Sequence, residues 1–349
     1  MPTATGIAPR SSISGIIEMT KTIRIFQNMN LLYNKNMDIS IVIPVFNAEK
    51  YLRRCVDSVL LAVKNFDGKA EILLIDNNSS DSSLEMARKF EGASVLQCHT
   101  AGAAAVRNYG MAHAHGKYVW FIDADDEITP DSISLLMGTA RATDANLIML
   151  GAKRIYADGH TDYLSAVRPD EPNFKSRFVR YGMGPWQCLI KRTWWNKNGF
   201  SFREGMIHED MELMSALILY VDEKYAAVDK PLYLYYQNDE SVLHKGKFSE
   251  HIFDIFPALS GLYERFEKAG AVEVYHDELE WFFIWNLLID SAKDFAKFPE
   301  GHIGFARSRE MLQKYFPDWR KNRFLKQKPL KLRARILLNF YSFPRLRAS

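Results

Sequence analysis

Apolar runs followed by polar turns occupy the first part of the chain. The run at residues 38–46 is continuous and rich in β-branched side chains, which is typical of a strand buried on both faces of a parallel sheet. Residues 70–76, 93–98 and 117–122 repeat this pattern. The sequence therefore predicts four strands here, and a further strand at 146–155.

Amphipathic segments separate these apolar runs. Asn47 is placed to cap the first helix, and Ser82 with Glu85 matches the capping-box pattern of the second. Strands that alternate with helices in this way indicate an α/β fold with a doubly wound, mostly parallel sheet and helices on both faces. The predicted helices cover residues 52–63, 84–90, 101–115 and 130–141.

The alternation weakens beyond about residue 160, where the pattern becomes α+β with long loops. We therefore expect the sheet to finish with the strand at 146–155. Helical patterns return at 211–220 and across 250–297, and residues 326–341 have the pattern of a basic amphipathic helix. These segments predict a helical C-terminal extension.

Basic residues are concentrated near the C-terminus. Ten Lys or Arg and no Asp or Glu lie between Arg320 and Arg347, while the rest of the chain has 35 basic and 42 acidic residues. Such a segment could dock peripherally on anionic lipids, or it could be a solvated helix that packs one face on the body, and both interpretations stay open. We expect no nucleic-acid partner, because these charges lie away from the predicted cleft.

Bulk properties indicate a globular protein. A chain of 349 residues that is 47% hydrophobic can bury a sizeable core. Three cysteines without a CxxC pair argue against a disulfide framework or a zinc site, and we expect a cytoplasmic location. No apolar window of about 18 residues predicts a membrane span. We expect residues 1–37 to be a disordered leader, within which a later Met could be the start.

Polar residues follow three of the predicted strands directly. Phe46 and Asn47 end the first strand, Asp76 and Asn77 the second, and the acids of 123–126 the fourth. In doubly wound sheets ligands bind beyond the carboxyl ends of the strands. We therefore expect these three segments to meet in one crevice.

The run YVWFIDADDEI places Asp123, Asp125 and Asp126 at a strand end. Carboxylates this close repel one another and favour a cation as partner. A hard ion such as Mg²⁺ or Mn²⁺ prefers oxygen ligands, and it commonly takes one or two carboxylates while a substrate phosphate completes its shell. The alternative is a solvated loop whose acids precede the helix at Pro130.

Two further polar segments could have either a chemical role or a purely structural one. Asp76 and Asn77 could bind a nucleoside base or ribose, although Asp and Asn are also ordinary turn residues. Glu209 and Asp210 begin an apolar helical stretch after His208, where acids are favoured by the helix dipole. A carboxylate there could instead be a general base that deprotonates an acceptor hydroxyl.

Taken together, five segments resemble the family 2 glycosyltransferases of the GT-A fold. They occur in the family's order and cover roughly residues 38–245. The segments are ISIVIPVFNAEKYLRRCVDSVL, ILLIDNNSSDSS, AGAAAVRNYGMAHAHGKYVWFIDADDEI, PWQCLIKR and FREGMIHEDMELM. The resemblance implies a Rossmann-like nucleotide-binding half at 38–130, an acceptor and catalytic half at 131–245, and a helical region with a basic tail at 246–349.

The resemblance also implies roles for individual residues. Asp210 matches the catalytic base of inverting members, with Glu209 beside it, and Trp186 matches the acceptor side of the cleft. The remaining matches concern the donor and its diphosphate. Donor-binding positions are Pro44, Phe46, Asp76, Asn77, Arg107, Asp123 and Asp125; metal-binding positions are Asp123, Asp125 and Asp126; and Tyr236, Ser241 and His244 match a segment that closes over the diphosphate.

The implied activity is inverting transfer of a sugar from a nucleotide sugar to a hydroxyl of a surface polysaccharide, lipopolysaccharide or lipid-linked oligosaccharide. The implied donor is UDP-linked and the implied cofactor is Mn²⁺ or Mg²⁺. Phe46 and Asn77 depart from the family's usual Tyr and Asp, and these departures concern recognition of the donor. A nucleotidyltransferase-like enzyme, or an inactive carbohydrate-binding module of this fold, stays open as an alternative.

Overall fold

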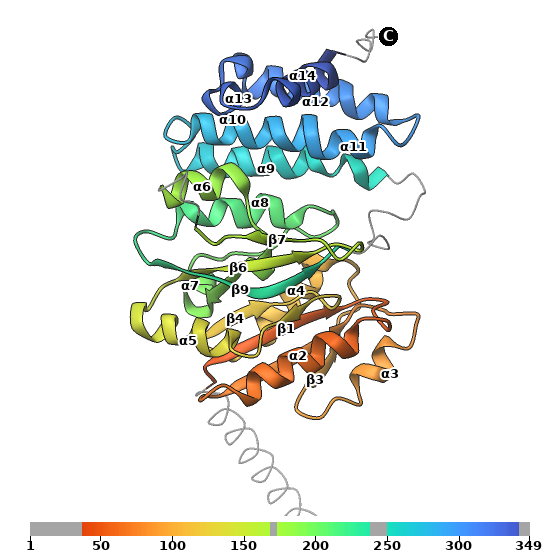
Figure 1. The fold of residues 1–349 in the computed structure, drawn as a ribbon, viewed down its shortest axis with the longest axis vertical. Helices are drawn as coiled ribbons and strands as arrows, with labels where there is room; N and C mark the ends of the chain where they lie inside the picture. Colours follow the sequence, from red (N-terminus) through yellow and green to blue (C-terminus); the bar gives the residue numbers. More distant parts are fainter. Residues whose placement is uncertain (1–36, 168–172, 238–249, 342–349) are drawn as a thin grey trace, which may run out of the picture.

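The computed structural model describes residues 37–167, 173–237 and 250–341. A mixed sheet forms its centre, with strand order β3-β2-β1-β4-β8-β6-β9-β5 and β7 paired to β6 (Figure 1). Residues 1–36 of the expected leader lie outside the described residues, as do Ser241 and His244.

The N-terminal half is the predicted alternation of strands and helices. Its four strands are parallel neighbours in the order β3-β2-β1-β4. Ile41 of β1 packs in the cluster that contains the first helix, whereas Val42 faces the cluster on the other side of the sheet. Burial on both faces explains the continuous apolar run. The elements are β1 (Ile39–Val45), α2 (Leu52–Lys64), β2 (Ala70–Asp76), α3 (Ser83–Ala87), β3 (Ser94–Gln97), α4 (Ala103–His113) and β4 (Tyr118–Phe121).

The sheet does not finish with the strand at 146–155, so that expectation was wrong. β8 lies antiparallel between β4 and β6, and β9 runs parallel to β6 with a register shift around Gly151. A four-residue strand and a strand interrupted by Pro231 give little period-2 signal, which explains why the pattern missed them. The strands are β5 (Glu127–Ile128), β6 (Leu147–Ile155), β7 (Thr161–Leu164), β8 (Cys188–Lys191) and β9 (Tyr225–Tyr236).

The remaining helices cover the sheet and then stack beyond it. In Figure 1 the C-terminal helices form layers at the end of the molecule opposite β1 and α2. A π-helical turn, Asn286–Asp290, joins α10 to α11. The helices are α5 (Ser132–Thr143), α6 (Phe174–Tyr181), α7 (Arg192–Lys197), α8 (Glu209–Ala216), α9 (Ile255–Lys268), α10 (His276–Trp285), α11 (Ser291–Phe295), α12 (Gly301–Tyr315), α13 (Arg323–Lys326) and α14 (Leu330–Tyr341), with 3₁₀ turns at Pro185–Gln187, Leu217–Leu219, Glu250–Phe253 and Trp319–Lys321.

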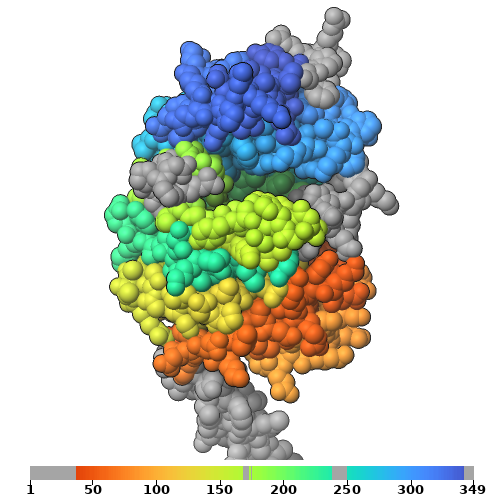
Figure 2. All heavy atoms as spheres, in the orientation of Figure 1, coloured from red at the N-terminus to blue at the C-terminus, as the bar shows by residue number. Residues whose placement is uncertain are grey.

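One hydrophobic core is shared by the sheet and the C-terminal helices. Phe121 of β4 and Leu213 of α8 belong to the same buried cluster as Leu259 of α9 and Phe283 of α10. Figure 2 shows the C-terminal helices packed directly against the rest of the described chain. The helical extension therefore contributes side chains to the core beneath the sheet.

Two capping predictions were wrong. Neither α2 nor α3 has a side-chain cap hydrogen bond at its start. Asn47 instead has φ +47° and accepts a hydrogen bond from the Ser80 backbone N–H at 2.8 Å, while the hydroxyl of Ser83 accepts from the Ala48 N–H at 2.7 Å. The polar side chains thus join the loops after β1 and β2 to each other.

The three cysteines are free and buried, as their spacing suggested. Within the described ranges, no helix combines the length and the apolar character that a bilayer crossing requires.

Candidate active site

The ends of β1, β2 and β4 lie side by side. Val45 pairs with Asp76 across β1 and β2, and Val42 pairs with Phe121 across β1 and β4. The three polar segments expected to meet therefore leave adjacent strands at one edge of the sheet. This edge is where doubly wound sheets bind ligands.

Arg107 connects this edge to α8. Its Nη2 lies 3.2 Å from Oδ1 of Asp123, and its Nη1 forms an ion pair with Oε1 of Glu209. Burial alone lowers the pKa of Arg107, but the carboxylates of Asp123, Glu209 and Asp210 together raise it above its ordinary value. The guanidinium stays charged and joins Asp123 to Glu209, which is far from it in the sequence.

Close packing of α4 on the sheet brings Arg107 to this position. A Cβ atom at Gly110 would lie 2.4 Å from Cγ1 of Val42, so only glycine permits the observed approach of helix and strand. Arg107 is one turn earlier on the same helix and is 8% exposed. Residues three apart lie on the same side of a helix, so the close approach at Gly110 also holds Arg107 near the sheet.

Glu209 and Asp210 have different surroundings although they are adjacent. Glu209 is buried, and burial raises the pKa of its carboxyl while the charge of Arg107 acts to lower it. Asp210 is partly exposed, and its Oδ1 accepts a hydrogen bond from the N–H of Met211 at 2.8 Å. His208, just before them, has φ +69°, a left-handed conformation that is costly for a non-glycine residue.

Burial alternates along the acidic run. Asp123 and Asp125 are partly exposed, whereas Asp126 is 1% exposed. Oδ2 of Asp126 accepts from the Tyr233 hydroxyl at 2.7 Å, and Oδ1 accepts from the Tyr236 N–H at 2.8 Å. Burial, together with the neighbouring carboxylates, raises the pKa of Asp126 to about 8. Asp126 thus anchors β9 to the run, and its role as a metal ligand stays a prediction.

Arg54 also contacts the acidic run, although no pattern in the sequence predicted this contact. Its Nη2 donates to the carbonyl of Asp125 at 2.6 Å, and its Nε lies 3.1 Å from Oε1 of Glu127. Its guanidinium carbon is 3.6 Å from the ring centroid of Tyr236. Tyr233 was missed as well, although the alternation of Tyr233 and Tyr235 in β9 places both rings on one face of a strand.

Asp76 and Asn77 differ in how many of their polar atoms are satisfied. Oδ1 of Asp76, a residue only 2% exposed, has no hydrogen-bond partner in the described part of the chain. Asn77 donates to the carbonyls of Cys98 and Thr100 and accepts from the N–H of Gly102. Asn77 shapes the loop after β3, while Asp76 has a buried oxygen whose hydrogen-bonding capacity is unsatisfied by the described residues.

Phe46 and Pro44 lie at the end of β1. Phe46 is 51% exposed, which is unusual for a large apolar side chain and leaves its ring face available for stacking. Pro44 is partly buried and pairs with Ile75 of β2. Both residues therefore border the strand edge that carries Asp76.

Trp186 forms an aromatic stack with two tyrosines of β9. Its ring lies 4.5 Å from that of Tyr233 and 5.2 Å from that of Tyr235, between centroids. A cavity of about 240 Å³ adjoins this stack. Trp186 lines the cavity and stacks on Tyr233, whose hydroxyl bonds to Asp126, so these two rings connect the cavity to the acidic run. The cavity is lined in part by Arg154, Arg177, Tyr181, Trp186, Gln187 and Tyr235.

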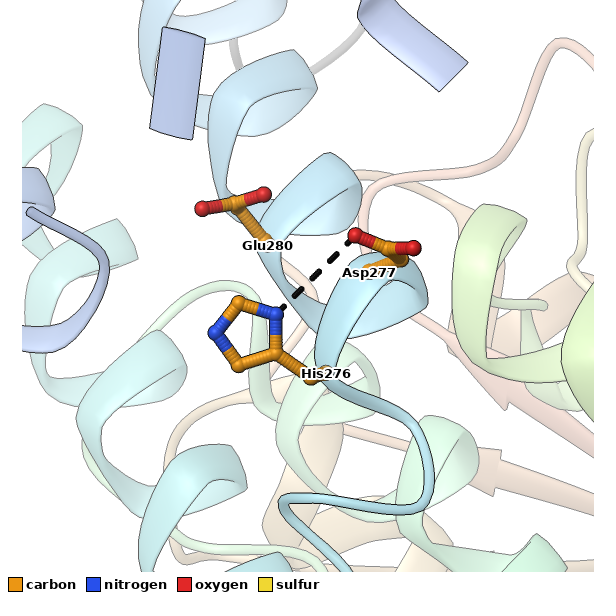
Figure 3. A group of neighbouring side chains, drawn as sticks. All are labelled: His276, Asp277 and Glu280. Carbon is orange, nitrogen blue, oxygen red and sulfur yellow. Dashed lines mark ion pairs between the residues drawn. The ribbon is translucent and has the colours of Figure 1, made fainter. Parts of the chain in front are cut away.

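Another group of potential metal ligands lies on α10, in the C-terminal helices (Figure 3). His276, Asp277 and Glu280 have ligand atoms within 4.8 Å of one another. Arg323 already pairs with Asp277 at 3.0 Å, and Nδ2 of Asn322 donates to Oε2 of Glu280 at 2.8 Å. These contacts give the group protein partners, so we do not identify it with the expected metal site.

The chemistry of the donor set at the strand end fits a divalent ion. Asp123 and Asp125 lie in a turn that is closed by a hydrogen bond from the Asp126 N–H to the Asp123 carbonyl at 3.1 Å, and the local excess of negative charge contributes to the raised pKa of Asp126. Asp123 shares its charge with Arg107, and the backbone of Asp125 is held by Arg54. Asp125, with Asp123 nearby, would hold the ion.

Comparisons with known proteins agree with this geometry. Residues 40–196 match the family model of glycosyl transferase family 2. The glycosyltransferase YibD of Escherichia coli K12 is 27% identical over 231 residues, which are 61% of this chain and 66% of that protein. The poly(ribitol-phosphate) β-N-acetylglucosaminyltransferase TarS of Staphylococcus aureus MW2 is 21% identical over 280 residues, or 78% of this chain and 45% of TarS.

The fold is also that of a solved relative. A crystal structure of S. aureus TarS residues 1–349 with UDP-GlcNAc superposes with a TM-score of 0.67 at 17% identity, covering 87% of this chain and 89% of that one. The family-model match at residues 40–196 includes the strand ends, Arg107 and the acidic run. Residues 40–196 therefore belong to the family 2 glycosyltransferases, and the chain has the GT-A fold.

Proposed function

We propose that the protein transfers a sugar from a nucleotide sugar to an acceptor hydroxyl, with inversion at the anomeric carbon. The observation that carries this proposal is the ion-pair bridge of Arg107. It brings Asp123, at the edge of the sheet, to Glu209, the neighbour of Asp210. A donor diphosphate site and a general base are thereby joined in one site.

The donor would bind at the ends of β1 and β2. Phe46 offers an exposed ring for stacking on a base, and Oδ1 of Asp76 is a buried acceptor that a nucleoside hydroxyl or N–H can satisfy. Pro44 and Asn77 shape this pocket. We propose a UDP-linked donor, in line with the UDP-GlcNAc that accompanies the TarS structure.

Asp125 and Asp123 would hold Mn²⁺ or Mg²⁺ against the donor diphosphate. When bound, such an ion offsets negative charge on a departing phosphate group. Arg107 and Arg54 keep the two acids in place, Arg107 through the side chain of Asp123 and Arg54 through the backbone of Asp125. The two arginines therefore orient the carboxylates that would bind the ion.

Asp210 would take the proton from the acceptor hydroxyl. Its carboxylate is partly exposed, whereas that of Glu209 is buried and paired with Arg107. A general base needs access to the acceptor, which favours Asp210 over Glu209. Glu209 instead positions Arg107 and, through it, the acidic run.

The acceptor would enter beside Trp186. Tryptophan and tyrosine rings stack well on the apolar faces of sugars, and the cavity next to them also has polar groups. We propose a glycan of a surface polysaccharide, a lipopolysaccharide or a lipid-linked oligosaccharide as acceptor, and a hexosyl or N-acetylhexosaminyl group as the transferred sugar. Free, buried cysteines fit a cytoplasmic location.

Replacement of the base tests the mechanism. Asp210→Asn should lower kcat by roughly 100- to 10,000-fold, the usual range for loss of general-base catalysis, with little change in donor affinity. Turnover is measured as release of nucleoside diphosphate from a panel of nucleotide sugars with Mn²⁺, and donor binding by calorimetry. Asp222→Asn is the matched control, because Asp222 is exposed and its φ of +50° suits asparagine.

Different outcomes separate the alternatives. Full turnover by folded Asp210→Asn would exclude the base assignment. Metal-dependent donor binding without any release of nucleoside diphosphate from the unaltered protein would instead indicate an inactive carbohydrate-binding module. Release of pyrophosphate from a nucleoside triphosphate would indicate nucleotidyl transfer.

A further inference from the structure

Helix α14 has two separate apolar faces. Leu332, Ile336 and Phe340, spaced by four residues, are partly or fully buried against the body. A second stripe follows the other side of the helix at the spacings expected for one face. It consists of Leu330, Ala334, Leu337, Leu338 and Tyr341, and its four large members are 77%, 38%, 62% and 62% exposed in that order.

The buried face holds α14 firmly, so the exposed stripe is not the result of a loosely packed helix. Nδ2 of Asn339 donates to the carbonyl of Leu288 at 2.7 Å, within the π-helical turn. Nη1 of Arg309 donates to the carbonyl of Phe340 at 3.2 Å, near the end of the helix. The helix therefore presents its second face in a fixed orientation.

Exposed cations border the stripe. Lys331, Arg333 and Arg335 are all exposed on α14, and Lys326 is exposed just before it. The sequence from 320 to 347 contains no acidic residue that could neutralise them within the segment. An apolar stripe between basic residues is the pattern of helices that lie in the interface of an anionic membrane.

We propose that this face of α14, defined by Leu330, Leu337, Leu338 and Tyr341 with Lys331, Arg333 and Arg335, docks on an anionic lipid bilayer. The apolar side chains enter the boundary between headgroups and acyl chains, and the cations contact the lipid phosphates. A second copy of the chain is a poorer occupant, because pairing this face with itself brings the same positive charges together. The surface lies among the C-terminal helices at one end of the molecule (Figure 1).

Co-sedimentation of the full chain with vesicles tests this surface. The protein should bind vesicles that contain phosphatidylglycerol, bind pure phosphatidylcholine weakly, and dissociate as salt is added. Lys331→Gln/Arg333→Gln/Arg335→Gln should weaken binding by roughly 100-fold, at about fivefold per charge near the surface. Leu330→Ser/Leu338→Ser should also reduce binding, while its melting temperature stays that of the unaltered protein.

Control variants remove apolar or charged side chains from other parts of the surface. Val274→Ser removes another exposed apolar side chain, and Lys89→Gln/Lys197→Gln/Lys230→Gln removes three exposed charges far along the sequence from α14. Both control variants should bind vesicles as the unaltered protein does.

The proposal is overturned if the unaltered protein stays in the supernatant, or if the α14 variants sediment to the same extent as the unaltered protein. It also fails if the protein is a dimer in gel filtration that Leu330→Ser/Leu338→Ser dissociates. Vesicle binding requires neither donor nor acceptor, so its failure leaves the proposed transfer reaction untouched.

Discussion

The hydroxyl of Tyr233 holds two parts of the acidic run. It donates to Oδ2 of Asp126 at 2.7 Å and accepts from the N–H of Asp123 at 3.1 Å. Burial, with the nearby carboxylates, raises the pKa of Tyr233 well above its ordinary value, so the hydroxyl keeps its proton and remains a donor. The same ring stacks on Trp186. One side chain therefore joins the acidic run to the ring of Trp186.

Tyr233→Phe should lower the free energy of unfolding by about 1–3 kcal/mol, because it leaves two buried polar groups without a partner. It should also weaken Mn²⁺-dependent nucleotide binding, since the backbone of Asp123 loses a support. Urea unfolding and calorimetry measure the two effects. Tyr235→Phe is the control, because it keeps both hydrogen bonds of the Tyr233 hydroxyl. Equal behaviour of the two variants would contradict the role of Tyr233.

At the scale of elements, α9 fixes α8 and hence the residues at its start. Glu212 of α8 is 5% exposed and accepts two hydrogen bonds from Arg265 of α9, at 3.0 and 2.9 Å. A Cβ atom at Gly261 would lie 2.5 Å from Oε2 of Glu212, so a larger residue at position 261 would displace this carboxylate. The helix that begins with Glu209 and Asp210 thus depends on the C-terminal extension.

Gly261→Ala should destabilise the protein by about 1–3 kcal/mol, the usual cost of inserting a methyl group into a packed site. Activity should fall as well, because Glu212 or the whole of α8 has to move. Gly138→Ala provides the contrast: it lies inside α5, has nothing within 4 Å of its added Cβ, and should gain up to about 1 kcal/mol from helix propensity. Thermal melts and turnover follow both variants, and a Gly261→Ala protein as stable as the unaltered one would refute the close approach.

At the scale of the molecule, the sheet and the C-terminal helices share a core. Phe121, Leu213 and Phe283 belong to one cluster, although they come from β4, α8 and α10. Separate domains would each bury their own apolar faces and could unfold independently. A shared cluster favours a single cooperative unit.

We therefore expect the two regions to unfold together in urea. Amide hydrogen exchange should show the same opening free energy for the most protected residues of β1 and of α10, and this energy should equal that of global unfolding. Coincident fluorescence and circular-dichroism transitions provide an independent measurement. Earlier opening of α10 would show that the C-terminal helices form a separate unit.

The sequence was sufficient to predict the N-terminal strands and the edge at which their polar residues meet, because strands buried on both faces have an unmistakable apolar run. It was insufficient for β8 and β9, which are short or interrupted. The sequence did not predict the ion pairs of the site either. Nothing in the spacing of Arg107 and Glu209 indicates their ion pair, which exists only because α4 and α8 meet in space.

The anchoring of α14 by Asn339 has a mechanical consequence for an enzyme at a bilayer. If α14 left the body, the carbonyl of Leu288 would lose its hydrogen-bond donor, so the helix is expected to remain in place when the protein docks. The proposed membrane surface and the catalytic edge then move as one rigid body rather than through a flexible tether. The active site would be held at a constant height and tilt above the lipid, and that height would set the shortest acceptor chain able to reach it.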